Sequence, residues 1–505
     1  MAVTLFAAID VGSYEVEMKI YELASRVGIR QIDYVSHRIE MGTDTYTRGK
    51  ISVEKIEELC RVLQDFVRIM EGYKVSGYRA CATSAIREAQ NSRLLLEYVK
   101  RTTGITVENL DNSEQRFLDY KSIAFGLKDF YKIIQKGTAI VDVGSGSVQV
   151  SLFDNDKLVT TQNIRIGNLR IREKVADLAR QTVHVEAMVE ELINNEIVSF
   201  KKMYLKDREI KNLILGGDYI YDLMKKESVS RAEFELMFEK VVESRPEDIA
   251  REYGIPSESA SLILPSVTLY KRLIEELGAE MIWLSDMALS DGIAYDYAQK
   301  KKFIRTEHEF KDDIVAAARV IAKRYQCNKG HIRNLENLAL PLFDRIRKSS
   351  GMADRHRLLL QIAVILHGCG KYINFSNAAD CSYSIIMSTE IIGLSLRERQ
   401  IIANVVKFNT KEMHYEDTVN CLGMNPEEYL LIMKLTAILR VANALDRSHK
   451  QKFDAVRLSI KERELIIQVD TREDITLERG LFPPKAEFFE EVFHIRPVIR
   501  QKKHL

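Results

Sequence analysis

Two copies of the tetrapeptide Asp-Val-Gly-Ser, at Asp10 to Ser13 and at Asp142 to Ser145, contain the residue types best suited to phosphate chemistry. Each copy follows an apolar run and precedes a segment in which apolar residues alternate. This pattern predicts a buried strand, a glycine turn and a second strand, made twice. Mg²⁺ takes carboxylate oxygens and keeps several waters, so one or two aspartates at strand ends can hold it. We therefore expect Asp10 and Asp142 to bind Mg²⁺; the alternative is an aspartate that only stabilises its turn.

Small residues follow both aspartates and recur at a third place in the chain. The amides and serine hydroxyls of such loops can hold phosphate oxygens. The third place ends a predicted strand and opens a predicted helix, where glycine lets an anion approach the helix N-terminus closely. Hairpins also need glycine turns, but two facing loops predict a phosphate clamp in a cleft between two halves. The candidate phosphate-binding residues in these loops are Gly12, Ser13, Gly144, Ser145, Gly146, Ser147, Gly216 and Gly217.

Arg87 and Glu114 each lie in the first turn of a predicted helix. The helix dipole slightly disfavours a cation there, so Arg87 indicates an anion nearby, although an ordinary surface contact with Glu88 would also serve. Glutamate is a common stabilising residue in a first turn. A helix cap is therefore the main alternative to a general base for Glu114.

Alternating strands and helices must position these residues. In residues 1–127 we expect strands at 4–10, 15–23, 30–36, 77–82 and 105–110, with helices between the later ones. Residues 128–302 repeat this order. Two units that each open with a three-stranded meander and continue with alternating helices and strands resemble the actin-like, ribonuclease-H-like architecture.

The rest of the chain changes character. Residues 303–450 have almost wholly helical periodicity, and residues 451–505 return to short strands and a short helix. We therefore predict an α/β protein with two actin-like domains, 1–127 and 128–302. An all-α domain, 303–450, and a small α+β region, 451–505, would follow them.

Composition narrows the class of protein. At 505 residues the chain is too long for a single core. No apolar stretch approaches the roughly 20 residues of a membrane helix, and no charged-then-apolar leader precedes the first strand. We therefore expect a cytoplasmic protein with no membrane partner. The 6 cysteines form no CxxC pair, which predicts reduced thiols and no zinc site.

Basic residues are concentrated between Lys300 and Arg357, where 15 Lys and Arg stand against 7 Asp and Glu. Such a segment suits a polyanion, whether a nucleic acid, a polyphosphate or a nucleotide. A solvated helical face with basic residues spread around it explains the same charge.

Short motifs in a fixed order resemble the exopolyphosphatase and guanosine pentaphosphate phosphatase (Ppx/GppA) family. In the first two domains the matching segments are Ala8–Ser13, Ala82–Arg87, Glu114–Arg116, Val141–Ser147, Ile166–Arg170 and Leu215–Gly217. In the helical part the segments that resemble the HD-like third domain of this family are His331–Asp344, Leu366–Gly370, Ile373–Ser376, Leu394–Arg399 and Ala444–Arg447. The resemblance covers nearly all of the chain.

The resemblance implies Mg²⁺-dependent removal of terminal phosphate from inorganic polyphosphate, or of the 5′ γ-phosphate of guanosine pentaphosphate (pppGpp). Asp10 and Asp142 would hold the metal, Glu114 would activate the attacking water, and Arg87 with the serine-glycine loops would bind phosphate. The family also implies a homodimer, and we expect no specific nucleic-acid partner. A sugar kinase of the same architecture is a competing class, but no adenosine pocket is evident after Gly217.

Departures from the family pattern lie in the ligand-facing loops. Gln149, a third catalytic candidate beside Glu114 and Asp142, replaces the glutamate of the family sequence Gly-Gly-Gly-Ser-Thr-Glu. An amide can orient water but cannot take its proton. Tyr14 replaces a small Asn, and Asp218 replaces a Thr. A weakly active regulatory homologue that binds polyphosphate or an alarmone therefore stays an alternative.

The HD-like domain departs further. A working HD site needs a His, an adjacent His-Asp pair and a distant Asp as metal ligands. His331, His367 and Asp446 are present, but Gly368 replaces the central Asp. We expect no catalytic metal there; the basic residues fit a groove for a long anionic chain, and the histidines fit a protein core.

Overall fold

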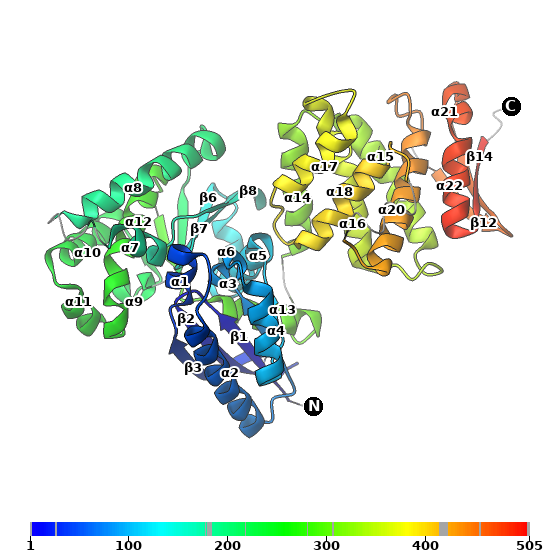
Figure 1. Ribbon diagram of the computed structural model, residues 1–505. Helices are drawn as coiled ribbons and strands as arrows, with labels where there is room; N and C mark the ends of the chain where they lie inside the picture. The colour runs from blue at the N-terminus through cyan, green and yellow to red at the C-terminus, as the bar shows by residue number, and fades with distance from the viewer. Residues whose placement is uncertain are drawn as a thin grey trace. The chain divides into compact units, whose positions relative to one another are not determined.

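Two compact units, Met1–Glu309 and Phe310–Leu505, make up the chain in the computed structural model. The structure describes residues 3–25, 28–176, 178, 184–217, 219–279, 281–305, 308–413, 423–453 and 456–501. Figure 1 shows the helices and strands of each unit. Asp218, one of the departures noted above, lies outside the described residues.

The first unit begins with a five-stranded sheet in the order β3-β2-β1-β4-β5. Its strands are β1 (Thr4–Val11), β2 (Glu15–Ala24), β3 (Gly28–Arg38), β4 (Gly77–Ala82) and β5 (Val107–Asn109). Its helices are α1 (Met41–Arg48), α2 (Val53–Tyr73), α3 (Ser84–Glu88), α4 (Ser92–Thr103), α5 (Asn112–Gly126) and α6 (Phe130–Ile133). β1 is central, antiparallel to β2 and parallel to β4.

Alternation along β1 determines which way its final aspartate points. Ala7 and Ile9 pack with residues of α2 and α4. Phe6 and Ala8 pack instead with residues of α5 and of α13 (Leu289–Lys300). Because successive side chains of a strand point to opposite faces, Asp10 lies on the face that carries Phe6 and Ala8.

A six-stranded sheet in the order β10-β11-β9-β6-β7-β8 follows. Its strands are β6 (Thr138–Val143), β7 (Val148–Asp154), β8 (Lys157–Ile164), β9 (Asn212–Gly217), β10 (Ser228–Val229) and β11 (Met281–Leu284). Its helices are α7 (Asn168–Val175), α8 (Val185–Phe200), the π-helix η2 (Lys201–Leu205), α9 (Ile220–Met224), α10 (Arg231–Glu243), α11 (Pro246–Tyr253), η3 (Ser257–Ser259) and α12 (Ala260–Leu277). β6 is antiparallel to β7 and parallel to β9.

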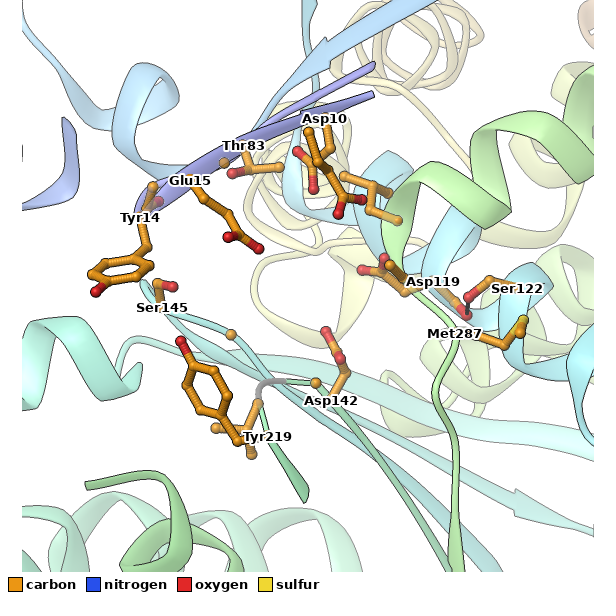
Figure 2. A pocket seen from close by; sticks show the side chains of 18 of the residues that line it. Asp10, Tyr14, Glu15, Thr83, Asp119, Ser122, Asp142, Ser145, Tyr219 and Met287 are labelled. Atoms are coloured by element: carbon orange, nitrogen blue, oxygen red, sulfur yellow. Dashed lines mark hydrogen bonds between the residues drawn. The ribbon is translucent and has the colours of Figure 1, made fainter. Parts of the chain in front are cut away.

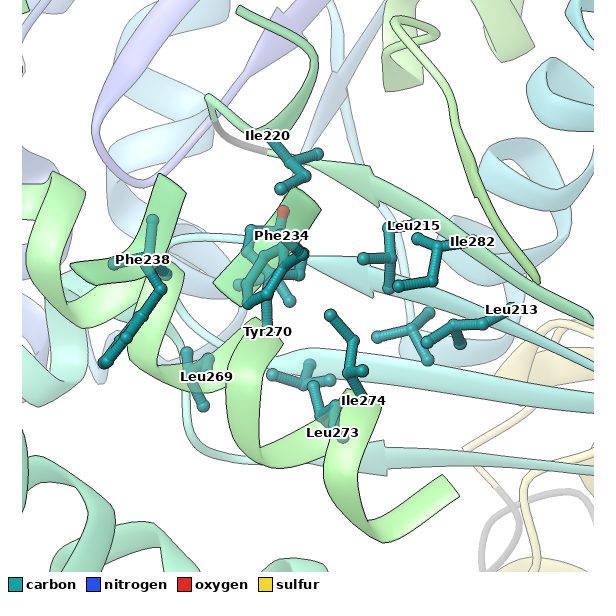
Figure 3. Close-up of a cluster of buried hydrophobic side chains, with 14 of the residues drawn as sticks. Leu213, Leu215, Ile220, Phe234, Phe238, Leu269, Tyr270, Leu273, Ile274 and Ile282 are labelled. Atoms are coloured by element: carbon teal, nitrogen blue, oxygen red, sulfur yellow. The ribbon is translucent and has the colours of Figure 1, made fainter. Parts of the chain in front are cut away.

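Helix α12 closes the core on one face of this second sheet. Figure 3 shows Tyr270 and Ile274 of α12 packed beside Leu213 and Leu215 of β9. The Tyr270 hydroxyl donates a hydrogen bond of 2.9 Å to the carbonyl oxygen of Gly216. A core tyrosine thereby holds the end of β9.

The two sheets repeat one plan, as the sequence predicts. In each, an antiparallel meander of three strands is extended by a parallel strand beside its first member. The same register also recurs: Asp10 pairs with Glu17, and Asp142 pairs with Gln149. The predicted α/β class with two actin-like domains is confirmed.

The second unit is mainly helical. Its helices are α14 (Phe310–Arg324), α15 (Lys329–Ile346), α16 (Asp354–Leu366), η4 (Cys369–Tyr372), α17 (Ala378–Ser388), α18 (Leu396–Phe408), α20 (Pro426–Leu445), α21 (Thr476–Leu481) and α22 (Pro483–Phe493). Its sheet has the order β12-β13-β14, with β12 (Val456–Lys461), β13 (Glu464–Val469) and β14 (Arg496–Gln501). The all-α part and the small α+β region are confirmed.

Some elements differ from expectation. The sequence did not predict α1 or β14. β14 pairs only with β13 and carries Pro497, and proline weakens the strand signal while being tolerated at a sheet edge. The predicted domain boundaries at 127, 302 and 450 stay predictions. Along the chain, the first unit ends at Glu309 and the second begins at Phe310. In the part of the chain that the structure describes, no helix is long and apolar enough to span a bilayer, and all five cysteines are free.

Candidate active site

A cavity of about 650 Å³ lies where the ends of β1 and β6 approach each other. Both predicted metal ligands and nearly all of the predicted phosphate-binding residues line it. The predicted residues on its wall are Asp10, Gly12, Ser13, Asp142, Gly144, Ser145, Gly146, Ser147, Gln149 and Gly217. The structure therefore brings the two copies of Asp-Val-Gly-Ser into one site.

Asp10, Asp119 and Asp142 surround a shared space in this cavity (Figure 2). Asp10 and Asp142 end equivalent strands, and Asp119 comes from α5. In the described ranges, no three or more His, Cys, Asp or Glu side chains form a group that could hold a metal by themselves. The carboxylate oxygens of Asp10 and Asp142 nevertheless fit Mg²⁺, because this ion usually keeps several waters and shares its ligands with substrate phosphates.

Hydrogen bonds hold the first loop in place through the Ser13 side chain. The Ser13 Oγ accepts hydrogen bonds from the Ala85 amide, at 3.1 Å, and from the Tyr46 hydroxyl, at 2.9 Å. It also lies 2.9 Å from the Ser84 Oγ. A Cβ atom at Gly12 would lie 2.6 Å from the Glu15 carbonyl oxygen, so the tight turn requires glycine. These bonds fix Ser13, so the loop is organised before any ligand arrives.

The second loop is held by α7. The Arg170 amide donates to the Ser145 carbonyl at 3.2 Å, and the Arg170 Nε donates to the Gly146 carbonyl at 2.9 Å. A Cβ atom at Gly146 would lie 2.1 Å from the Ser84 Oγ, so a side chain there would have to displace the Ser84 hydroxyl. Arg170, the last residue of the motif Ile166–Arg170, thus fixes the geometry of the second loop.

Three predicted residues do not line the cavity: Arg87, Glu114 and Gly216. Glu114 belongs to a capping box at the start of α5, in which its Oε2 accepts a hydrogen bond of 3.2 Å from the Asp111 amide. This is the alternative role considered above. The Arg87 Nη1 donates to the carbonyl of Leu110 at 2.9 Å. Catalytic and phosphate-binding roles for Glu114 and Arg87 stay predictions.

Asp119 is the main cavity residue that the sequence reasoning missed. It lies in the interior of α5, is only 9% exposed, and lines the cavity. Its Oδ2 accepts a hydrogen bond of 3.1 Å from the Gln149 Nε2. Burial, followed by the charges of Asp142 and Asp10, holds the pKa of Asp119 well above its ordinary value. The sequence does contain a signal for this residue: Asp119 is a charged residue between Leu118 and Tyr120, and both of these are core residues of α5.

Glu17 is a second missed carboxylate. It pairs with Asp10 across β1 and β2, lines the cavity, and is only 7% exposed. Burial raises its pKa, whereas the charge of Lys19 and a hydrogen bond from the Ser290 hydroxyl act in the opposite direction. Lys19 is itself paired with Asp291 at 2.7 Å.

The second unit contains a separate cavity of about 380 Å³ lined by three histidines. The His331 Nδ1 lies 2.7 Å from Asp446, and the His367 Nδ1 lies 2.7 Å from the carbonyl oxygen of Val364. Burial lowers the pKa of His367 to about 3, and the charge of His331 acts in the same direction. The rings of His331 and His449 are stacked, with their centroids 3.6 Å apart. His331 is buried, whereas His367 and His449 are partly exposed on the cavity wall.

Comparison with known proteins identifies relatives over most of the chain. A guanosine-5′-triphosphate,3′-diphosphate pyrophosphatase from Photobacterium profundum is 20% identical over 480 residues, which are 92% of this chain and 91% of that protein. An exopolyphosphatase structure from Cytophaga hutchinsonii is 19% identical, with a TM-score of 0.51 over 59% of this chain and 98% of that one. A Ppx/GppA family member from Aquifex aeolicus is 20% identical, with a TM-score of 0.49 over 61% of this chain and 100% of that one.

Two family matches cover both units. Residues 25–301 match the Ppx/GppA phosphatase family, and residues 315–482 match domain III of the same family. The first match includes the second glycine-serine loop, Asp119 and Asp142, and together the matches follow the order expected from the sequence motifs. The chain belongs to the Ppx/GppA phosphatase family.

Proposed function

We propose that this chain is a Mg²⁺-dependent exopolyphosphatase that releases terminal orthophosphate from inorganic polyphosphate. The observation that supports this best is the single cavity lined by Asp10, Asp142 and both glycine-serine loops. Family membership supports phosphatase chemistry at a coarser level. The identity of the substrate and of the metal goes beyond family membership and belongs to this proposal.

The loops suit the demands of phosphoryl transfer to water. This reaction needs in-line positioning and neutralised oxygens more than covalent participation by the protein. In the proposed reaction the oxygen of water forms a bond to the terminal phosphorus. The bond from that phosphorus to the bridging oxygen breaks, and its electron pair stays on the shortened chain. One proton leaves the water. The loops at Gly12 and Gly144–Ser147 would bind the terminal phosphate during this step.

Asp10 and Asp142 are the residues that would hold Mg²⁺. Both carboxylates end buried strands and line the cavity, and the described residues there do not form an all-protein metal cage. Mg²⁺ bound there would neutralise negative charge on the phosphate oxygens. The protein contributes the position of the two carboxylates, which the sheets fix on both sides of the cavity.

Guanosine pentaphosphate is the second candidate substrate, because aromatic side chains line the same cavity. Figure 2 shows Tyr14 and Tyr219 beside the loop residue Ser145. Tyr34 and Tyr221 also line the cavity. Aromatic rings can stack on a purine base. The Photobacterium relative also carries the name of a guanosine-nucleotide pyrophosphatase.

Phosphate release from long polyphosphate and from guanosine pentaphosphate, each with Mg²⁺ and with EDTA, tests this proposal. We expect Mg²⁺-dependent turnover that is faster on polyphosphate. Faster turnover of the nucleotide would establish the second candidate. Tight polyphosphate binding with no turnover of either substrate would support the weakly active regulatory homologue instead. The homodimer, the cytoplasmic location and the lack of a specific nucleic-acid partner stay predictions from the sequence.

A further inference from the structure

Gln149 and Asp119 are neighbours in the cavity wall, where the amide of Gln149 faces the carboxylate of Asp119. Gln149 lies on β7, where it pairs with Asp142 of β6 in the strand register. Its Nε2 donates to the Asp119 Oδ2 at 3.1 Å. Both side chains line the cavity, and their exposed fractions are 5% for Gln149 and 9% for Asp119. The amide is therefore paired with a carboxylate supplied by α5.

This pairing explains why an amide suits position 149. A glutamate there would place a second carboxylate at hydrogen-bond distance from Asp119, inside a largely buried wall. Two buried carboxylates this close cannot both be ionised without a large cost. The Gln149 amide instead satisfies one carboxylate oxygen of Asp119. The Gln149 Oε1 is buried and has no hydrogen-bond partner within the described ranges, so it presents an acceptor in the same wall.

We infer that Asp119 is the catalytic carboxylate that binds the attacking water, and that Gln149 positions it. The inference rests on the proposed phosphohydrolase function and names a residue within that site. In this chain the helix supplies the carboxylate, at Asp119, and the strand supplies the amide, at Gln149. Asp119 shares its space with Asp10 and Asp142 (Figure 2). Glu114 instead accepts a hydrogen bond in the capping box of α5 and does not line the cavity.

Asp119 would act directly on the water. Its carboxylate accepts a hydrogen bond from the water and then the proton released as the new P–O bond forms. The phosphorus–oxygen bond to the rest of the chain breaks in the same reaction, and the proton later passes to solvent. Gln149 keeps the carboxylate pointed into the cavity but does not touch the reacting atoms.

A double-variant cycle in the full-length chain, assayed on polyphosphate with Mg²⁺, tests the inference. Asp119→Asn keeps the size of the side chain and an acceptor for Gln149, and it is expected to lower kcat about 10²–10⁴-fold. Polyphosphate binding, measured separately, should stay near the wild-type level. Gln149→Glu alone should also lower kcat. The double variant Asp119→Asn with Gln149→Glu restores one carboxylate and one amide, so its kcat should exceed that of Asp119→Asn by at least about tenfold.

Controls separate the possible outcomes. Asp65→Asn, on the surface of α2, is the matched control, and thermal unfolding shows whether each variant is folded. Asp119→Ser provides a second variant in which the carboxylate is absent. Wild-type kcat in Asp119→Asn or Asp119→Ser, a gain in kcat in Gln149→Glu, or a larger loss in Glu114→Gln than in Asp119→Asn would each overturn the inference and leave the proposed function standing. If the wild-type chain released no phosphate from either substrate, the proposed function itself would fall.

Discussion

The guanidinium of Arg170 binds both carboxylate oxygens of Glu88, each at 3.0 Å. Arg170 belongs to α7 beside the second sheet, and Glu88 ends α3 beside the first. The same guanidinium lies over the Tyr46 ring, 3.9 Å from its centroid. Because Arg170 also binds the backbone of the second loop, this ion pair connects the loop to the opposite side of the cleft.

Breaking this ion pair should weaken substrate binding more than the chemical step. We expect Glu88→Gln to raise KM for polyphosphate about threefold to tenfold, because the loop would lose one of its supports, while kcat changes less. Arg170→Lys should have a larger effect, since a lysine ammonium cannot bind Glu88 through one nitrogen and the Gly146 carbonyl through another. Steady-state kinetics test this. Glu235→Gln, in the exposed Arg231–Glu235 pair of α10, is the control. An equal change in KM in Glu88→Gln and in Glu235→Gln would contradict the prediction.

Removal of either predicted metal ligand should weaken both Mg²⁺ binding and catalysis. Asp10→Asn and Asp142→Asn keep the shape of the side chain but remove a charge that Mg²⁺ requires. We expect kcat to fall at least about 100-fold in each, with the Mg²⁺ concentration for half-maximal rate raised or no longer measurable. Asp154→Asn, at the exposed end of β7, is the control. A variant that kept the wild-type Mg²⁺ response would show that its aspartate is not a metal ligand.

Gly146→Ala should destabilise the first unit. The added Cβ would lie 2.1 Å from the Ser84 Oγ and 2.3 Å from the Tyr46 hydroxyl, so the network around Ser13 must move. Overpacking of this kind typically costs about 1–3 kcal/mol. Gly72→Ala is the matched substitution, because nothing lies within 4 Å of its Cβ position in α2 and alanine favours a helix by up to about 1 kcal/mol. Chemical denaturation should give opposite signs for the two variants; the same sign would contradict the steric argument.

Asp119 should lower the stability of the Mg²⁺-free protein near neutral pH. Its pKa is raised well above the ordinary value in the folded state, first by burial and then by Asp142 and Asp10. Near pH 7 the unfolded chain is ionised at this position, whereas ionisation of the folded chain without Mg²⁺ is unfavourable. A metal held by Asp10 and Asp142 would offset their charges and favour the ionised Asp119 that the proposed reaction requires. Below the ordinary pKa both states bind the proton, and the difference between them disappears.

Asp119→Asn should therefore raise Tm in EDTA near pH 7 by about 2 °C or more, and by less near pH 4. Thermal unfolding followed by circular dichroism measures both values. Asp65→Asn should show no such dependence on pH. An equal effect of Asp119→Asn at the two pH values would mean that the pKa of Asp119 is not raised.

Local patterns were sufficient to predict the strands that end in Asp10 and Asp142, because alternation and glycine turns are encoded within a few residues. They also located the loops on the cavity wall. For Glu114 the same first-turn position suited both a base and a helix cap, and only the three-dimensional structure shows the capping hydrogen bond. The sequence did not predict Asp119 as a site residue because its hydrogen-bond partner, Gln149, is 30 positions away. No short-range pattern indicates which strand a helical residue will contact.

The register that pairs Asp142 with Gln149 has a consequence for how this protein can vary over evolution. Side chains alternate along a strand, so one residue gained or lost between these two positions would turn Gln149 into the hydrophobic core and bring Val148 or Val150 out to the cavity. Natural variants can exchange residue types in the segment 144–147 much more easily than they can change its length. A one-residue insertion there should be more damaging than most substitutions, even if every original side chain is kept.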